Sequence, residues 1–183
     1  MHRLPFSMIA AALTLTAASV DAFELRSADL PADAPIAQPH VANGFGCTGG
    51  NRSPALSWSD PPAGTRSFAV TAYDPDAPTG SGWWHWVVFD LPASATGLPA
   101  GAGDASGAAL PGGAVQSRTD TGTRGYFGPC PPPGDAPHRY VFTVHALKVE
   151  RLDLPADSSG ALVGFSLTAN RLGQATITAR YGR

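Results

Sequence analysis

Glycine and proline interrupt this sequence at short intervals, and this feature most limits how the chain can fold. The 183 residues include 21 glycines and 18 prolines, which are spread along the whole length. Proline breaks helices and removes a hydrogen-bond donor from a sheet, so long regular elements are disfavoured. Between the interruptions lie short stretches rich in β-branched and aromatic residues: SFAVTAYD (67–74), HWVVFDL (85–91), HRYVFTVHALKV (138–149) and QATITARY (174–181). These stretches predict an all-β chain with minor α content, folded as a β-sandwich rather than as an alternation of strands and helices.

One or two short helices are expected, and the clearest lies near the end of the chain. Ser158 or Ser159 can cap its N-terminus and Gly173 can end it, although Gly164 weakens the helical pattern. The apolar residues expected to pack from it are Leu162, Val163, Phe165, Leu167 and Leu172. The long stretch 93–113 has small, flexible residues and is expected to be a solvated connector.

The first 22 residues have the features of a secretory signal peptide. Arg3 supplies positive charge, MIAAALTLTAA (8–18) is a short apolar run, and Val20 and Ala22 suit a cleavage site after Ala22. An uncleaved anchor helix is the alternative, but the run is short for a membrane span. We therefore expect one exported domain over residues 23–183, periplasmic or secreted, without a transmembrane anchor.

The net charge limits the kinds of partner that this protein can bind, and the cysteine count indicates whether it contains a disulfide. The formal net charge is −2 with a pI near 6.2, and no run of lysines or arginines is present, which argues against a nucleic-acid partner. Cys47 and Cys130 are the only cysteines. In an exported chain this even number predicts a disulfide, worth about 4 kcal/mol through the entropy of the unfolded chain. Two free buried thiols are the alternative.

The stretch YDPDAPTGSGWWHW (73–86) concentrates groups that can bind or react. Asp74 and Asp76 flank a proline at a strand end, and His85 opens the next strand. His138 and Tyr140 share one face of a third strand, because side chains alternate along a strand. If these strands are neighbours, the groups converge on one pocket with aromatic and proline walls. The alternatives are aspartates that bond nearby turn amides, a core histidine, and an ordinary strand face.

Several motifs in this order resemble the phosphatidylethanolamine-binding protein family, also called Raf kinase inhibitor-like. The shared segments are NRSPALSW (51–58), DPDAP (74–78), GWWHWVVFDLP (82–92) and GPCPPPGDAPHRYVFTVHAL (128–147). GFGCTGGN (44–51), GPCPPPG (128–134) and SSGALVG (158–164) are similar to its exported bacterial YbhB/YbcL-type branch. The resemblance covers about residues 23–181. One departure is SRTD (117–120), where Thr119 stands in place of an expected asparagine, so the loop that it supports is expected to differ.

The resemblance implies an antiparallel, Greek-key-like β-sandwich with few helices and a small anion pocket near the surface. Where relatives have glycine before two prolines, this chain has Cys130, which fits a disulfide to Cys47 at the pocket lip. A carboxylate such as Asp74 beside His85 and His138 is expected to keep imidazoles protonated for anion binding. The implied ligand-binding residues are Asp74, Asp76, Pro78, Trp83, His85, Cys130, Pro131, Pro132, His138 and Tyr140.

The leading functional hypothesis is a non-enzymatic protein that binds a small phosphate-bearing anion or a phospholipid head group. The runner-up is a secreted interaction protein that inhibits a protease or engages another partner through its loops, or forms a homodimer, with a vestigial pocket. The third is an enzyme in which Asp74, Asp76, His85 and His138 ligate a metal or act as acid and base. No HExxH motif or nucleophile elbow supports it. No cofactor, metal or catalytic residue is therefore expected.

Overall fold

The computed structural model describes residues 22–31 and 34–183. The expected signal peptide, apart from Ala22, lies outside the described residues. Over those residues, no helix has both the length and the apolar character that crossing a bilayer requires.

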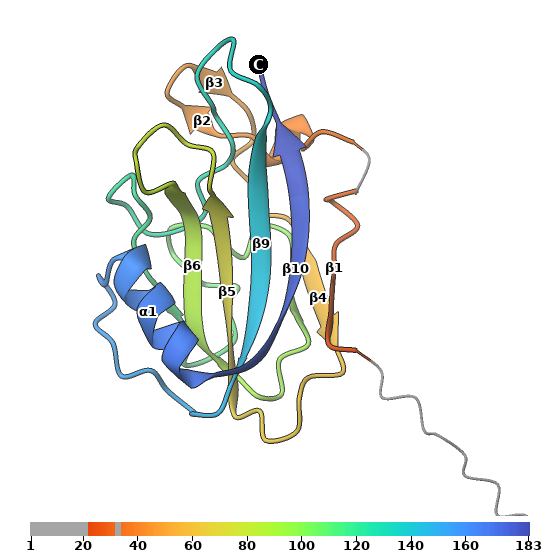
Figure 1. The fold of residues 1–183 in the computed structure, drawn as a ribbon, viewed down its shortest axis with the longest axis vertical. Coiled ribbons are helices and arrows are strands. Elements are labelled where there is room, and N and C mark those ends of the chain that lie inside the picture. The colour runs from red at the N-terminus through yellow and green to blue at the C-terminus, as the bar shows by residue number, and fades with distance from the viewer. Residues whose placement is uncertain (1–21, 32–33) are drawn as a thin grey trace, which may run out of the picture.

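A five-stranded antiparallel sheet forms the centre of the molecule, with the strand order β10-β9-β5-β6-β8. A smaller antiparallel sheet has the order β1-β4-β7, and β2 and β3 form a short hairpin (Figure 1). The strands are β1 (Glu24–Arg26), β2 (Asn43–Gly44), β3 (Cys47–Thr48), β4 (Leu56–Ser59), β5 (Ser67–Asp74), β6 (Trp83–Pro92), β7 (Gly97–Leu98), β8 (Val115–Gln116), β9 (His138–Leu147) and β10 (Arg171–Tyr181).

The two faces of the large sheet pack against different layers. One face meets the small sheet, where Trp58 of β4 contacts Phe68 of β5 with ring centroids 5.4 Å apart. The other face meets helix α1 (Gly160–Asn170), whose Val163 and Leu167 are buried. Alternation along β5 explains this division, because Phe68 points to one layer and Ala69 to the other. The predicted antiparallel β-sandwich with little helix is confirmed.

The boundaries of several elements differ from those expected. Strand β9 ends at Leu147 and not at Val149, whereas β6 and β10 are longer than predicted. A three-residue 3-10 helix (Gln38–His40) accompanies α1 in the described part of the chain. The stretch 93–113 is not a solvated connector, because it contains β7 and its Leu98 and Ala102 are buried in the core.

Helix α1 begins where it was expected but ends earlier and packs differently. The Ser159 side chain accepts a hydrogen bond from the Leu162 amide and caps the helix. The helix stops at Asn170, so Leu172 belongs to β10, and Leu162 and Phe165 are exposed. Val163 and Leu167 pack on the sheet as expected, and Gly160 faces it too, since a Cβ at Gly160 would overlap the Trp84 ring.

The antiparallel arrangement brings three strand ends to one edge of the large sheet. Because β5 runs opposite to both β6 and β9, its last residue lies beside their first residues. Asp74 pairs with Trp83 of β6, and Tyr73 pairs with Val141 of β9. The loops at this edge, the β2–β3 hairpin and the C-terminus gather at one end of the molecule (Figure 1).

Candidate binding pocket

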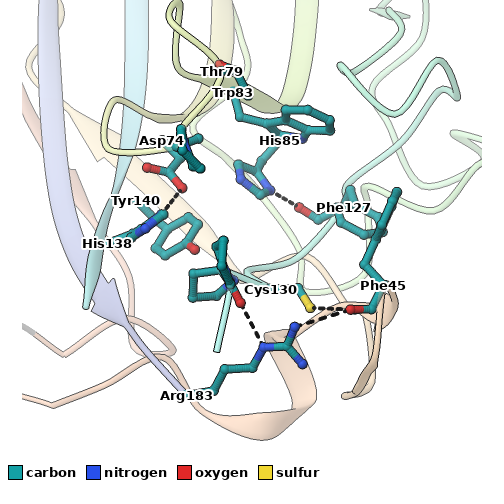
Figure 2. Close-up of a pocket in the computed structure, with 14 residues that line it drawn as sticks. Phe45, Asp74, Thr79, Trp83, His85, Phe127, Cys130, His138, Tyr140 and Arg183 are labelled. Atoms are coloured by element: carbon teal, nitrogen blue, oxygen red, sulfur yellow. Dashed lines mark hydrogen bonds and ion pairs between the residues drawn. The ribbon is translucent and has the colours of Figure 1, made fainter. Parts of the chain in front are cut away.

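A pocket of about 320 Å³ opens at this end of the molecule. It contains nine of the ten residues expected from the sequence, which come from β5, the β5–β6 loop, β6, the segment before β9, and β9 (Figure 2). The expected residues that line it are Asp74, Pro78, Trp83, His85, Cys130, Pro131, Pro132, His138 and Tyr140. Proline and aromatic side chains make most of the wall, and the few polar groups stand among them.

Asp74 and His138 form a buried ion pair in the wall of the pocket. The His138 Nδ1–H donates to Asp74 Oδ2 at 2.8 Å, and Nε2–H donates more weakly to Asp135 Oδ2 at 3.4 Å. Burial alone would lower the pKa of His138, but the hydrogen bonds and charges of Asp74 and Asp135 outweigh burial and raise that pKa above its ordinary value. His138 is therefore protonated more readily than an ordinary histidine, and its charge, when present, is balanced by its neighbours.

Asp74 also bonds a nearby turn amide, which was the alternative role expected for the aspartates of DPDAP. Its Oδ1 accepts a hydrogen bond from the Asp76 amide at 2.8 Å, as in an Asx turn. Both carboxylate oxygens of Asp74 thus already accept protein donors, and the residue is only 2% exposed. Asp74 is available to a ligand mainly as a fixed negative charge.

Asp76 does not line the pocket. Its carboxylate receives two side-chain bonds and the backbone amide of Arg139, at 2.7, 2.9 and 2.8 Å. This side-chain bonding, more than any other cause, lowers the pKa of Asp76. A side chain two positions along a true strand would share the face of Asp74, but Asp76 lies in the turn after β5 and faces Arg139 instead.

His85 is neutral, contrary to the expectation that Asp74 keeps it protonated. Its Nδ1 lies 2.6 Å from the Phe127 carbonyl oxygen, which is an acceptor, so Nδ1 carries the proton. Burial lowers the pKa of His85 and outweighs the hydrogen bond to Phe127 and the charge of Asp74. The carboxylate pairs with His138 and not with His85, since the His138 ring lies 2.8 Å from Asp74 Oδ2 while the His85 ring is bonded to the Phe127 carbonyl.

Tyr140 presents a polar atom that has no partner. The residue is 2% exposed, its ring meets His85 edge to face at 5.1 Å, and its hydroxyl makes no hydrogen bond within 3.5 Å with any described residue. Burial raises the pKa of Tyr140 well above its ordinary value, and the charge of Asp74 with a weak contact between the hydroxyl and that carboxylate acts in the same direction, so the hydroxyl keeps its proton. A buried hydroxyl without a partner is costly in a folded protein unless something else binds it.

The lip of the pocket is tied together by a disulfide and by an arginine. Cys47 and Cys130 are bonded, as predicted, with their Cα atoms 6.0 Å apart. Arg183 Nε donates to the Pro131 carbonyl at 2.7 Å, and its terminal nitrogens donate to the Gly46 and Phe45 carbonyls at 3.1 and 3.3 Å. The arginine therefore joins the same two loops that the disulfide joins (Figure 2).

Five lining residues were not expected from the sequence: Phe45, Ala77, Thr79, Phe127 and Arg183. The predicted disulfide could have identified Phe45 as a lining residue, because a bond from Cys47 to the pocket residue Cys130 brings residues 44–47 to the lip of the pocket. Phe45 packs edge to face on Phe127 at 5.4 Å. Arg183 has no comparable signal, since its place follows from the pairing of Tyr181 with His138 at the end of β10.

Thr119, the departure from the family pattern, supports the loop beside His85 with its hydroxyl. Thr119 Oγ1 lies 2.7 Å from Thr121 Oγ1 and 3.2 Å from the Thr123 carbonyl oxygen. The next residue, Asp120, accepts a bond from the Trp84 amide at 2.8 Å, which attaches the loop to β6. The hydroxyl network thus supports the shape of the loop, and Asp120 holds the loop against the strand that carries His85.

The residues of the metal or acid–base hypothesis are only partly brought together. Asp74, His85 and His138 line the pocket, while Asp76 pairs with Arg139 outside it. Within 22–31 and 34–183, no three His, Cys, Asp or Glu side chains are grouped as metal ligands would be.

The sequence and the fold of this chain are similar to those of known proteins. UPF0098 protein YbcL of Escherichia coli K12 is 51% identical over 181 residues, which is 99% of this chain and 98% of that protein. UPF0098 protein YbhB of the same organism is 53% identical over 158 residues, covering 86% and 99%. The crystal structure of E. coli YbcL, titled a new member of the mammalian PEBP family, matches with a TM-score of 0.86 and 53% identity, over 88% of this chain and 98% of that one. Since the phosphatidylethanolamine-binding protein family also matches residues 27–182, this chain belongs to that family.

Proposed function

We propose that this protein binds small phosphate-bearing anions, such as phospholipid head groups, in the pocket beside Asp74 and His138, and that it does so without catalytic turnover. The observation that carries the proposal is the Tyr140 hydroxyl, which is buried in the pocket wall and has no partner among the described residues. It is a donor held in place by the fold, and a phosphate oxygen is an acceptor that would satisfy it.

The charges around Tyr140 favour a singly charged phosphate. The charge of protonated His138 is already balanced by Asp74, and Asp135 adds a further negative charge nearby. A phosphate dianion would be repelled by these carboxylates, whereas a phosphodiester has one charge at all physiological pH values. The aromatic rings of Trp83, Phe45 and Phe127 offer faces on which an ammonium group can rest.

The test replaces Tyr140 by phenylalanine, which removes the hydroxyl and leaves the shape unchanged. Binding of glycerophosphoethanolamine, measured by calorimetry, should weaken about tenfold in Tyr140→Phe, since a hydrogen bond to a charged group is lost. The free energy of unfolding should not fall, because the hydroxyl has no protein partner to lose. Equal affinity in the two proteins would contradict the proposal.

Tyr126→Phe is the matched control. The Tyr126 hydroxyl is also buried, but it donates to the His40 carbonyl oxygen at 2.9 Å and lies outside the pocket. Its removal should lower stability by about 1 kcal/mol and leave the affinity for the phosphodiester unchanged. The two tyrosines therefore separate a binding role from a structural one.

A second candidate function is recognition of a protein partner at the lip. Phe45 favours it, because its ring is 69% exposed at the rim of the pocket. Large exposed aromatic side chains are frequent at the centres of protein interfaces. If no phosphate ligand binds at any pH, this candidate takes precedence.

Export is part of the proposal and rests on two observations. Residues 1–22 have the pattern of a signal peptide, and the chain contains a disulfide between its two cysteines. Edman sequencing of the mature protein from its native host tests this directly. An N-terminus at Phe23 is the expected result, and an N-terminus at Met1 would contradict it.

A further inference from the structure

The strongest unexplained feature of the pocket is the Arg183 guanidinium at its mouth. Three of its five N–H groups donate to backbone carbonyls of Phe45, Gly46 and Pro131. Among the described residues, no Asp or Glu oxygen lies within 4.0 Å of this guanidinium, although Arg139, at the same end of the molecule, pairs with Asp76. One N–H on each terminal nitrogen is left for another acceptor.

Unlike the Arg183 guanidinium, the carboxylates near the pocket are either already bonded to protein donors or lie outside the pocket wall. Asp74 is buried and both of its oxygens accept protein hydrogen bonds. Asp135 faces His138 and lines the adjoining groove, and it is absent from the pocket wall. An ammonium group on a ligand therefore finds aromatic faces here but no free Asp or Glu carboxylate, whereas an anionic group finds at the mouth a guanidinium that no described Asp or Glu side chain pairs with.

We infer that Arg183 is a specificity-determining residue that selects phosphate ligands bearing a second anionic group, a carboxylate, as in a phosphoserine head group. This inference rests on the proposed function, because it assigns the ligand class of the same pocket. The phosphate is bound at the Tyr140 hydroxyl, and the carboxylate accepts the two remaining N–H groups of Arg183. Each of the two terminal nitrogens keeps one donor for one carboxylate oxygen, and lysine, with a single nitrogen, cannot supply donors from two.

The test compares two ligands that differ by one carboxylate. Glycerophosphoserine and glycerophosphoethanolamine share the phosphodiester and the ammonium, so their affinity ratio isolates the contribution of the carboxylate. Calorimetry with the disulfide-bonded mature protein at low salt should give tighter binding of glycerophosphoserine, by about tenfold. In Arg183→Gln this ratio should fall to near one, and because the ratio compares two ligands on the same protein, any loss of loop support affects both affinities and leaves the ratio interpretable.

Two further variants separate charge from loop support. Arg183→Lys keeps the charge and loses the paired donors, so it should retain only part of the preference. Arg180→Gln is the matched control, because Arg180 lies on β10 and lines the adjoining groove but not the pocket. It should leave the affinity ratio unchanged.

The outcomes distinguish this inference from the proposed function. If wild type binds neither ligand, the proposed function fails. If wild type binds both equally, or if the preference survives in Arg183→Gln, the phosphodiester site stands and the role of Arg183 is overturned. A third probe, O-phosphoserine, distinguishes the source of the ligand: weaker binding than glycerophosphoserine indicates a lipid head group, and tighter binding indicates a free phosphorylated amino acid selected by the same arginine.

Discussion

Asp74 and His138 lie 2.8 Å apart, from Oδ2 to Nδ1, and both side chains are almost completely buried. They come from neighbouring antiparallel strands, so the sheet itself holds them together. The pair places a balanced charge beside the neutral His85 and the unpartnered Tyr140 hydroxyl. This arrangement makes the electrostatic behaviour of the pocket testable through single substitutions.

Asp74→Asn should lower the pKa of His138. The carboxylate raises that pKa against the effect of burial, so its removal leaves burial dominant. NMR titration of the His138 ring should show a clear downward shift of the titration midpoint. Asp76→Asn, whose carboxylate pairs with Arg139, should produce a much smaller shift. An unchanged His138 midpoint in Asp74→Asn would show that the buried pair is not electrostatically coupled.

Binding of a phosphodiester should weaken as the pH rises through the raised pKa of His138, and not through that of His85. The cation balances Asp74 only below the pKa of His138 in the folded protein, and Asp135, Asp76 and Arg139 are the other charges near it. Calorimetry with glycerophosphoethanolamine between about pH 5.5 and 8.5 brackets the ordinary imidazole pKa.

Two histidine variants assign this pH dependence. His85→Asn, which keeps a donor for the Phe127 carbonyl, should follow the wild-type pH profile with altered absolute affinity. His138→Gln should bind weakly with a flat profile. A flat profile in His85→Asn together with a wild-type profile in His138→Gln would reverse the assignment.

His145 should reduce the stability of the protein in acid. Its Nε2 lies 3.1 Å from Thr71 Oγ1 and its Nδ1 has no partner among described residues. Burial, with the charge of Arg171, lowers the pKa of His145 to about 4. The unfolded chain therefore takes up a proton between about pH 6.5 and pH 4 that the folded protein refuses, and stability falls as the pH falls.

The lowered pKa of His145 corresponds to a loss of about 3 kcal/mol in the free energy of unfolding between about pH 6.5 and pH 4. Urea unfolding of wild type and His145→Gln at about pH 7.5 and pH 4.5 measures it. His85 contributes in the same direction, since its pKa is also lowered, so the difference between the two proteins isolates His145. Equal losses of stability in the two proteins would rule out His145 as a source of acid sensitivity.

Gly160→Ala should destabilise the protein, whereas Gly164→Ala should not. Both glycines face Trp84 from α1, but a Cβ at Gly160 would overlap the ring, while one at Gly164 would lie 3.3 Å from its edge. Overpacking at Gly160 should cost about 2 kcal/mol. At Gly164 the gain in helix propensity offsets the tight contact. Thermal unfolding of the two variants tests this, and similar melting temperatures would contradict it.

The motifs of this chain were enough to predict its class and most of its pocket. Alternation in 67–74, the apolar run 85–91 and the β-branched run 138–149 indicated the strands of a β-sandwich. The order of the motifs indicated the family, which the comparisons confirm, and the family implied the antiparallel pairing that the strands show. Nine of the ten expected residues line one cavity because their motifs end or begin neighbouring strands. Local patterns are informative here because strand alternation and proline interruptions are properties of short stretches.

Only the tertiary structure determines which side chains of the pocket form ion pairs or hydrogen bonds with one another. Nothing in DPDAP shows that Asp74 turns to His138 while Asp76 turns to Arg139, because that choice depends on the turn after β5 and on the register with β9. The protonation of His85 depends on its burial and on the Phe127 carbonyl, which is 42 residues away in the sequence. Arg183 reaches the pocket only because β10 pairs with β9 to its last residue. Electrostatic interactions and hydrogen bonds depend on how far apart two groups lie in space, and the separation of two residues in the sequence does not determine that distance.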